Sequence, residues 1–486
     1  MPPMRICLVT LHASPPFTPL ALLYLKSYLV EYGGETPDDI AILEFTQQSD
    51  AEEMVARILA TDPVVVGVSC YVWNIKKMMA ACAAVKARRP EVRIVLGGPE
   101  VGPVAASVLR ANPSADVIVR SEGELPFAEL VARWGRDGGA ADLRDVKGIV
   151  FREGDEIVET AEAPILQDLN HLASPHMRAY VEPAGRIICV ETQRGCVFRC
   201  NFCFYNKDLS IRNRRFDLDR VKDEIRFWLQ QDIRELYLMD PIFNLNAERA
   251  KEICRFIAEH NTRRIPLHAE VWAEFIDDEL ARLMREANFQ FLEVGLQSTD
   301  DTALATVDRR LKMQRFTDGV AHLKAYKLNF ELQLIYGLPG ETPSSFRKSL
   351  NFAAALAPDE LAVFPLMILP GTELWRKAAG LHLQFDPEPP YFVQSHFSMT
   401  TADIEYGRKI IAALYDLGRS KTLRMLGRER ASTFADVVDE WIAWQERETG
   451  PEEEGYRVKQ FIVEFCEKKR IPVDFYRGFA SWEFSG

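Results

Sequence analysis

The sequence predicts an α/β protein in which two parallel sheets follow one another and a helical part completes the chain. Three observations support this prediction. Residues 1–160 and residues 186–386 each alternate apolar runs with amphipathic segments of helical spacing. The runs of the first unit are apolar at nearly every position, which indicates strands buried on both faces and therefore a parallel sheet covered by helices. Three prolines in residues 161–185 indicate a linker between the two units, and helical spacing dominates residues 387–486.

The first unit is predicted to be a doubly wound, Rossmann-like parallel sheet. Thr18, directly ahead of Pro19, is the expected N-cap of its first helix, and Ser49 with Glu52 forms a capping box for the second. Such sheets bind ligands at the carboxyl ends of their strands, which places His12 at a ligand-binding edge. The strands are predicted at 5–11, 40–45, 64–70, 92–98 and 116–120, with a closing hairpin near residue 160.

The second unit is predicted to form a partial barrel. Six apolar runs, beginning with residues 186–191, alternate with amphipathic helices such as Leu218 to Gln231. A TIM-type barrel has eight such units, so six units predict an open (βα)6 barrel with its functional residues just after the strand ends. Further helices are predicted at Ala402 to Leu417 and Tyr456 to Lys468, and aromatic residues cluster near the C-terminus.

Composition and charge narrow the class of protein. Hydrophobic residues make up 47% of the 486 residues, enough for several cores. No apolar run reaches the roughly 18–20 residues of a membrane-spanning helix, and the N-terminus lacks the layout of a signal peptide. The net charge of -12 argues against a broad nucleic-acid surface. Nine scattered cysteines do not form a disulfide framework. We therefore expect a cytoplasmic protein with neither a membrane nor a nucleic acid as its partner.

Three cysteines directly after the first barrel strand are the strongest chemical signal. Cys196, Cys200 and Cys203 stand at C-x3-C-x2-C spacing, and the next cysteine, Cys254, is far along the chain. A cubane iron–sulfur cluster that is ligated only by the protein needs four thiolates. Three thiolates leave one iron open, and an open iron binds substrate or cosubstrate. The alternatives are a zinc knuckle, which would need a fourth ligand, or three unrelated core cysteines.

The three-cysteine motif, with Phe202 just before its last cysteine, resembles the signature of the radical SAM superfamily. The strand-end segments MDPIFN, EVGLQS and YGLPGET fit this resemblance, as do LGGPEV, VRSEGELPF and GIVFR in the first unit. Together they resemble radical SAM enzymes with an N-terminal cobalamin (B12)-binding-type domain, over about residues 5–385. The resemblance implies a [4Fe-4S] cluster held by the three cysteines. It also implies that the amine and carboxylate of S-adenosylmethionine (SAM) bind the open iron.

One departure from the family pattern concerns cobalamin. In this family an Asp-x-His-x-x-Gly motif follows the first strand, and its histidine is the lower ligand of cobalt. This chain reads TLHASPPF there, so His12 has neither the aspartate before it nor the glycine behind it. Some related enzymes bind cobalamin without a histidine ligand, so the sequence leaves cobalamin open and predicts His12 to be a strand-end surface histidine.

The resemblance also implies SAM-contacting residues at the barrel mouth, while it nominates no catalytic residue. Each contact has a structural alternative: packing for the aromatic residues, an ion pair for Glu293, and an ordinary turn for the glycines. The strand-end Cys70 and a basic patch at Arg212, Arg214 and Arg215 are further candidates for the cavity. The nominated cofactor contacts are Phe202, Tyr205, Asp240, Glu293, Gln297, Ser298, Gly337 and Gly340.

The implied reaction is the reductive cleavage of SAM and the modification of a small-molecule substrate by a transferase. With cobalamin, the implied chemistry is methyl transfer to an unactivated carbon. One alternative is transfer of the aminocarboxypropyl group of SAM to a small soft acceptor, such as trivalent arsenic, without cobalamin. Another, from a different class, is a non-catalytic iron–sulfur electron carrier. The reactions on SAM imply an external electron donor of the flavodoxin or ferredoxin type.

Overall fold

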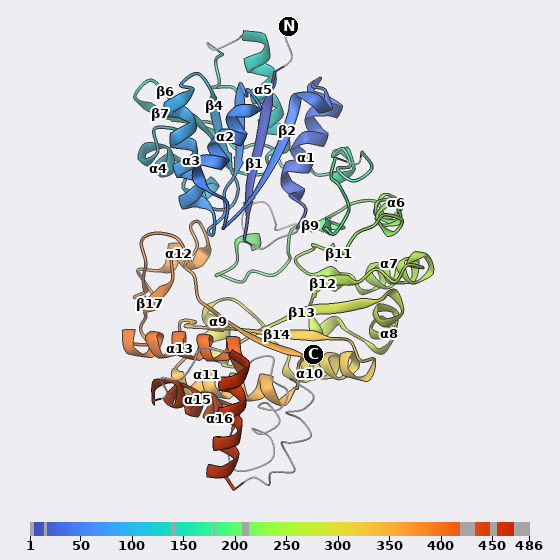
Figure 1. The fold of residues 1–486 in the computed structure, drawn as a ribbon, viewed down its shortest axis with the longest axis vertical. Helices are drawn as coiled ribbons and strands as arrows, with labels where there is room; N and C mark the ends of the chain where they lie inside the picture. The colour runs from blue at the N-terminus through green and yellow to red at the C-terminus, as the bar shows by residue number, and fades with distance from the viewer. Residues whose placement is uncertain are drawn as a thin grey trace.

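The two predicted sheets lie one above the other in the computed structural model, with the N-terminal sheet at the top of Figure 1 and the barrel strands below it. The α/β class, the doubly wound first unit, the partial barrel and the helical C-terminal part are confirmed. The structure describes residues 4–13, 17–137, 141–178, 180–206, 213–417, 433–447 and 454–470.

The N-terminal sheet has seven strands in the order β2-β1-β3-β4-β5-β6-β7. The first five are parallel, and β6 and β7 form the antiparallel hairpin that closes the unit. Strand β2 lies on one side of β1 and β3 lies on the other, so the strand order reverses between β1 and β3. In such sheets the ligand-binding crevice lies at the carboxyl ends of the strands where the order reverses. The strands are β1 (Ile6–His12), β2 (Ile40–Thr46), β3 (Val65–Ser69), β4 (Arg93–Gly97), β5 (Val117–Val119), β6 (Ile149–Glu153) and β7 (Glu156–Glu159). The helices are α1 (Leu20–Tyr28), α2 (Ala51–Ala60), α3 (Ile75–Arg88), α4 (Ala105–Ala111) and α5 (Glu124–Asp137).

Two helix starts in this unit differ from the prediction. Asp50, not Ser49, caps α2, because its carboxylate accepts the N–H of Glu53. Thr18 does not cap α1; its hydroxyl oxygen accepts the N–H of Cys189 on the first barrel strand. The hydroxyl oxygen of Ser49 accepts the N–H of Thr46 at 3.0 Å, so both predicted caps bond a backbone donor outside their helix.

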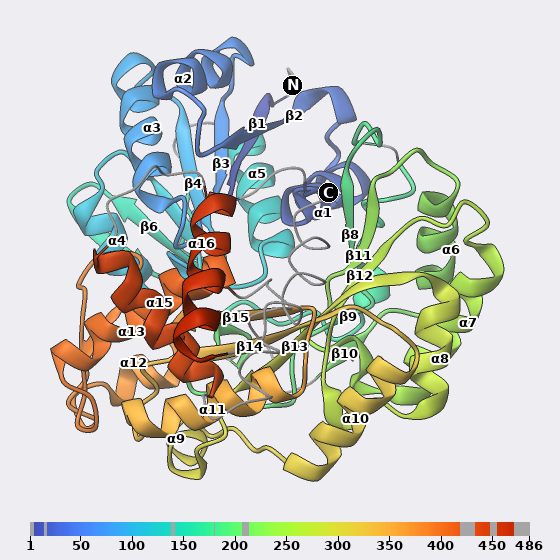
Figure 2. The same cartoon turned by 60° about the horizontal axis from the view of Figure 1, so that its bottom comes forward.

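The second unit is an open barrel of six parallel strands in the order β15-β14-β13-β12-β11-β8. Figure 2 shows α6, α7, α8 and α10 along its outer side. Side chains of β13 alternate between the two faces: Leu292 and Val294 are buried toward the helices, while Glu293 faces the interior and is partly exposed. The strands are β8 (Ile187–Val190), β11 (Glu235–Leu238), β12 (Leu267–Val271), β13 (Phe289–Gln297), β14 (Phe330–Tyr336) and β15 (Glu360–Pro365). The helices are α6 (Leu218–Leu229), α7 (Ala247–His260), α8 (Asp278–Ala287), α9 (Asp301–Thr306), α10 (Met313–Ala325), α11 (Pro343–Ala355) and α12 (Glu373–Lys377).

Both edges of the open barrel are covered, which limits the access of other chains to the backbone groups that edge strands present. At β8, Phe17 from the β1–α1 connection pairs with Ile187, and the N–H of Thr18 donates to the carbonyl of Ile187 at 3.0 Å. At β15, the helix α13 (Thr401–Leu417) packs along the strand. This approach is close: a Cβ on Gly407 would lie 1.9 Å from the ring of Tyr336.

The C-terminal part is mostly helical and lies against the lower side of the barrel in Figure 1. Two short ribbon strands, β16 (Gln384–Phe385) and β17 (Val393–Ser395), precede α13, and α15 (Phe434–Arg447) and α16 (Glu454–Lys468) follow it. The predicted aromatic cluster at the C-terminus lies outside the described residues. In the part of the chain that the structure describes, no helix has both the length and the apolar character to cross a membrane.

Candidate active site between the two sheets

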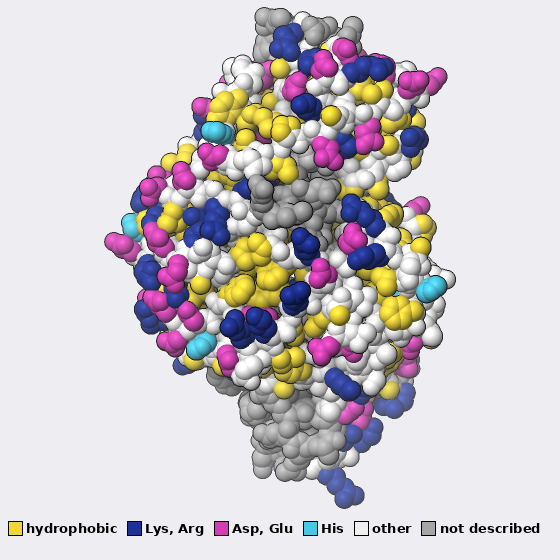
Figure 3. All heavy atoms as spheres, turned by 180° about the vertical axis from the view of Figure 1, so that it is seen from behind, with side chains coloured by type: hydrophobic (Ala, Val, Ile, Leu, Met, Phe, Trp, Pro, Cys, Tyr) yellow, Lys and Arg dark blue, Asp and Glu magenta, His cyan; other side chains and the backbone are white. Residues whose placement is uncertain are grey.

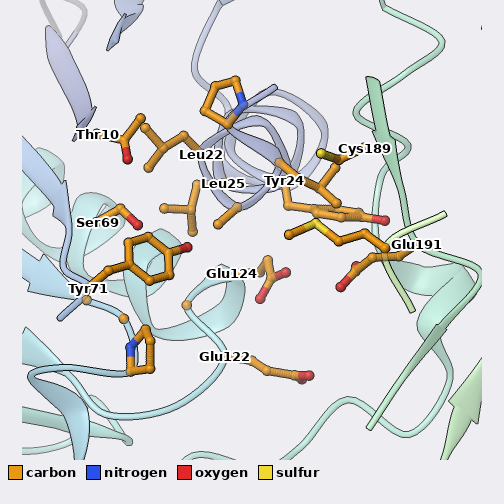
Figure 4. Close-up of a pocket in the computed structure, with 18 of the residues that line it drawn as sticks. Thr10, Leu22, Tyr24, Leu25, Ser69, Tyr71, Glu122, Glu124, Cys189 and Glu191 are labelled. Atoms are coloured by element: carbon orange, nitrogen blue, oxygen red, sulfur yellow. The ribbon is translucent and has the colours of Figure 1, made fainter. Parts of the chain in front are cut away.

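A cavity of about 620 Å³ lies between the carboxyl ends of the N-terminal strands and the mouth of the barrel, and we call it the interdomain cavity. Figure 4 shows Tyr71 and Glu122 reaching it from the N-terminal unit and Cys189 and Glu191 from the barrel side. Leu25 of α1 lies between Tyr71 and Tyr24 in this view. Both units therefore line a single space at their ligand-binding edges.

The interdomain cavity continues into the N-terminal unit as an apolar recess. Its walls come from β3, β4 and β5 on one side and from α1 and α5 on the other, so the two helices leave a space next to the sheet. A recess with apolar walls suits a large organic ligand such as the nucleotide tail of cobalamin. The residues that line this recess are Leu22, Leu25, Gly67, Val95, Val119 and Phe127.

His12 lines the interdomain cavity rather than lying on the outer surface. Its Nε2 is 2.8 Å from a carboxylate oxygen of Glu44. Glu44 in turn accepts two hydrogen bonds at 2.7 Å from Arg186, the residue just before β8. His12 thus belongs to an ion-paired contact between the two units, and one of its ring nitrogens is engaged by Glu44. A carboxylate partner on one ring nitrogen is also common for histidines that ligate a metal, so this contact fits cobalamin binding with or without a histidine ligand.

The three cysteines lie on a loop whose base is a two-stranded ribbon. Strand β9 (Gln193–Arg194) pairs antiparallel with β10 (Arg214–Arg215) and closes this cluster loop, residues 195–213. Cys200 is buried, and Cys196 and Cys203 are partly exposed. Two backbone hydrogen bonds of Asn201, with Val307 at 2.8 Å and Leu374 at 2.9 Å, anchor the middle of the loop to the barrel.

The donor set of the cluster loop fits a cubane cluster. Burial raises the pKa of Cys203 to about 12 and raises that of Cys196, so metal ligation would be what keeps these sulfurs as thiolates. Among the described residues, no three His, Cys, Asp or Glu side chains are gathered around a single metal-ion position. Three thiols that each ligate a different iron of a cluster do not need such a gathering.

A buried ion network joins the cluster loop to the N-terminal unit. Arg214 of β10 makes hydrogen bonds of 3.0 and 2.5 Å with the carboxylate of Glu122, at the end of β5. Arg194 of β9 lies 2.9 Å from carboxylate oxygens of Glu124 and of Glu191. We call Arg194, Arg214, Glu122 and Glu124 the interdomain clasp. It fixes both strands at the base of the cluster loop against the unit that holds the apolar recess.

One charged residue beside the cysteines escaped the sequence analysis. Arg309, in the connection between α9 and α10, places Nη1 at 3.7 Å from the sulfur of Cys200. No motif spacing links these two residues, which are 109 positions apart in the chain. The basic residues that the sequence did single out lie elsewhere: Arg214 belongs to the interdomain clasp, Arg215 is exposed, and Arg212 is outside the described residues.

Among the nominated cofactor contacts, Tyr205 lines the interdomain cavity. Phe202 packs against the barrel core, which is the alternative role given above for the aromatic residues. Glu293 lies on the inner face of β13, where it is 2.9 Å from Nε2 of His268 and accepts a hydrogen bond from Gln333 at 2.8 Å. The ion pair proposed as its alternative role is therefore present.

Asp240 and Ser298 turn away from the interdomain cavity. The carboxylate of Asp240 accepts the N–H of Thr192 at 2.7 Å and of Gln193 at 3.1 Å, so it anchors the start of β9. Burial raises its pKa to about 7. The hydroxyl of Ser298 donates to Glu341 at 2.6 Å, and both residues are fully buried. These contacts support structural roles.

The remaining nominated residues shape the backbone after β13 and β14. Gln297 has a positive φ of 71° at a bulge in the pairing of β13 with β14. Gly337 and Gly340 also have positive φ values, and added Cβ atoms would meet Val393 and Thr302, not the interdomain cavity. Cys70 is fully buried and is not part of the cavity wall, whereas Cys189, to which the sequence assigned no role, is.

Two protein-family models match the chain. The B12 binding domain matches residues 6–131, and the radical SAM superfamily matches residues 190–353. The first match covers the unit with the apolar recess, and the second covers the cluster loop and most of the barrel. The match to a B12 binding domain supports the cofactor that the sequence had left open.

Two curated relatives are methyltransferases by name. The chain is 29% identical over 381 residues to the cobalamin-dependent radical SAM methyltransferase TokK of Streptomyces tokunonensis, covering 74% of this chain and 54% of that protein. It is 28% identical over 400 residues to the 2-(S-pantetheinyl)-carbapenam-3-carboxylate methyltransferase of Streptantibioticus cattleyicolor, covering 77% of this chain and 57% of that protein. The chain thus spans little more than half the length of either relative.

A solved structure shares the fold over nearly the whole chain. The radical S-adenosylmethionine methyltransferase TsrM from Kitasatospora setae, solved with cobalamin and a [4Fe-4S] cluster bound, superposes with a TM-score of 0.67. The superposition covers 92% of this chain and 100% of that chain, at 17% sequence identity. This similarity shows a common arrangement of the two units and the C-terminal helices.

Proposed function

We propose that this chain, which joins a B12 binding domain to a radical SAM domain, is a cobalamin-dependent radical SAM methyltransferase that acts on a small molecule. The interdomain cavity is the observation that carries the proposal. It extends from the apolar recess to Gly195, the residue before Cys196. A ligand in the recess and a ligand at the cluster loop would therefore share one space, as a reaction that uses both cofactors requires.

Each part of the site has a definable task in this proposal. Cys196, Cys200 and Cys203 hold the [4Fe-4S] cluster, and the apolar recess holds the nucleotide tail of cobalamin. When bound, the cluster supplies an electron for SAM cleavage, and cobalamin supplies a carrier for the methyl group. The interdomain clasp orients the cluster loop. The mostly apolar walls of the interdomain cavity limit access of water to the reacting groups.

The proposal includes an external one-electron donor and a small-molecule substrate. The described cysteines outside the cluster loop are all buried. In the proposal, the electron for the cluster comes from a separate redox protein of the flavodoxin or ferredoxin type. A cavity of about 620 Å³ is in the size range of small-molecule sites.

The test is an anaerobic product analysis of the full chain. The protein is reconstituted with iron and sulfide, supplied with hydroxocobalamin, SAM and a reductant, and the products are identified by mass spectrometry. We expect S-adenosylhomocysteine that depends on hydroxocobalamin, together with 5'-deoxyadenosine. Methylthioadenosine in their place would indicate aminocarboxypropyl transfer. An intact cluster whose visible spectrum does not change when SAM is added would indicate an electron carrier and contradict the proposal.

Two cysteine variants form a matched pair for this test. Cys200→Ala removes a proposed cluster ligand, and we expect loss of iron and of all SAM-derived products. Cys254→Ala removes a buried thiol within α7, where no cluster is proposed. It should keep its iron and its products. Equal losses in the two variants would contradict the assignment of the cluster to the loop.

A further inference from the structure

Arg309 is a cation whose side chain contacts a cysteine of the cluster loop, and only 8% of its surface is exposed. Its Nη1 donates to the sulfur of Cys200 at 3.7 Å, and its Nη2 donates to the carbonyl of Gly295 at 2.6 Å. We infer that Arg309 donates a hydrogen bond to the Cys200 thiolate of the bound cluster and raises the reduction potential of that cluster. The inference rests on the proposed function, because it requires the cluster to be present.

The end of β13 is built to hold this arginine. The pairing of β13 with β14 shifts register between Gly295 and Gln297, so a bulge interrupts the ladder there. The carbonyl of Gly295 accepts the hydrogen bond from Arg309 at this point. A Cβ on Gly295 would lie 2.5 Å from Nε2 of Gln297 and 3.4 Å from Nη2 of Arg309, so the end of the Gln297 side chain would have to move, whereas the contact with Arg309 would be an ordinary one. The positive φ of Gln297 is strain of the kind that is found at functional sites.

An aromatic stack also holds the guanidinium of Arg309, in addition to its hydrogen bonds with Cys200 and Gly295. The centre of the Arg309 guanidinium lies 4.4 Å from the ring centroid of Trp272. Phe198 of the cluster loop stacks on the same indole, with a centroid distance of 4.0 Å and an interplanar angle of 8°. Two groups this close cannot share one face, so the indole lies between Phe198 and Arg309. Asn244 holds the backbone of Trp272 with hydrogen bonds of 2.9 and 3.0 Å.

The chemistry of the contact gives the sign of the effect. An arginine stays protonated in proteins, so a positive charge lies beside Cys200 in every state of the cluster. Reduction adds one negative charge to a cluster that three thiolates already ligate. Hydrogen bonds to the sulfurs and nearby charge set the reduction potential of such clusters. A buried cation that donates to a ligand sulfur stabilises the reduced form more than the oxidised form, which raises the potential.

The neighbouring residue offers a matched control. Arg310 carries the same charge one position further along, but its side chain is exposed. Solvent and salt screen an exposed charge, so its removal should leave the potential of the cluster almost unchanged. Arg309→Met and Arg310→Met remove the same charge from adjacent positions, and Arg309→Lys keeps the charge while changing the donor geometry.

The experiment is a redox titration of the reconstituted full chain, followed by the electron paramagnetic resonance signal of the reduced cluster. SAM is left out, so that contacts of Arg309 with SAM cannot affect the result. We expect Arg309→Met to lower the equilibrium constant for reduction of the cluster about tenfold. For a one-electron couple this is a shift of about 59 mV to more negative potential. Arg309→Lys should shift less, and Arg310→Met should match the wild type. Iron content is measured for every variant. If Arg309→Met loses its cluster, the reduction potential of Arg309→Lys is compared with that of the wild type instead.

Two outcomes would overturn the inference. One is a wild-type potential in the iron-loaded Arg309 variants. The other is an equal shift in Arg310→Met, which would indicate a general charge effect instead of a hydrogen bond to Cys200. Failure of the proposed function looks different, because a wild-type chain that binds no cluster gives no signal in the titration.

Discussion

At the scale of single residues, the fold decides the protonation of Glu341. Its side chain is fully buried, one oxygen accepts the hydroxyl of Ser298 at 2.6 Å, and the other has no hydrogen-bond partner among the described residues. Desolvation raises its pKa to about 8 from an ordinary value of 4.5. Glu341 is therefore a neutral acid at neutral pH, although its sequence context in YGLPGET gives no sign of this.

Glu341 predicts a pH-dependent stability with a definite sign. Between the ordinary pKa and about 8, the folded chain holds a proton that the unfolded chain has released. Stability must then fall as the pH rises through this window, by about 5 kcal/mol in total. Glu341→Gln removes the titration. We expect the midpoint of thermal unfolding of this variant to gain on the wild type between about pH 5 and about pH 8. Parallel pH profiles for the two proteins would show that Glu341 is ionised in the fold.

At the scale of structural elements, the interdomain clasp is the contact that we expect to matter most. Arg214 is 7% exposed and pairs with Glu122 from the other unit. Glu122→Gln leaves a buried arginine without its charged partner, which costs about 3 kcal/mol. The midpoint of thermal unfolding should fall and iron retention should decrease. Glu286→Gln is the matched control, since Glu286 pairs with Arg282 on the surface of α8. Its cost should be about 0.5 kcal/mol or less.

The packing of α13 on the barrel makes a second prediction at this scale. Gly407→Ala would place a Cβ 1.9 Å from the ring of Tyr336, so α13 must shift, at a cost of about 1–3 kcal/mol. Gly135 provides the comparison within α5, because its added Cβ would meet only the end of the Met4 side chain at 3.7 Å. Gly135→Ala should stabilise by up to about 1 kcal/mol. Thermal unfolding of both variants checks the pair, and a neutral Gly407→Ala would refute the close packing.

At the scale of the whole molecule, contacts on several sides of the interdomain cavity hold the two units together. The interdomain clasp lies beside the cluster loop, and the hydroxyl of Tyr391 in the C-terminal part donates to buried Glu100 after β4 at 2.5 Å. Figure 3 shows that the back of the molecule is a mixed surface, with hydrophobic side chains across its middle and Lys and Arg around them. A ligand between the units should therefore stabilise the chain as a whole.

Hydroxocobalamin should stabilise the full chain in proportion to the logarithm of its concentration. At about 100 times its dissociation constant, it would contribute about 2.7 kcal/mol. Cobinamide, which lacks the nucleotide tail, is the matched ligand. If the tail occupies the apolar recess, cobinamide should raise the midpoint of thermal unfolding less than hydroxocobalamin does at the same concentration. Equal shifts from the two ligands would place the tail outside the recess.

The sequence alone determined the order of the units, the parallel sheets and the cluster loop. Strand burial and helical periodicity are local patterns, and Cys196, Cys200 and Cys203 are close in space because they are close in the chain. Strand-end positions were also predictable, because parallel strands place their carboxyl ends at one edge. These features depend on residues that are a few positions apart, so they can be predicted from the sequence alone.

Only the tertiary structure decided which side chains meet. Asp240 stands at a strand end, yet its carboxylate turns to the backbone of Thr192 and Gln193. Glu122 finds Arg214 across 92 positions, and Arg309 finds Cys200 across 109. His12 pairs with Glu44 on the neighbouring strand. A position in the sequence sets the edge at which a residue lies, whereas the direction of its side chain depends on donors, charges and volumes contributed by distant segments.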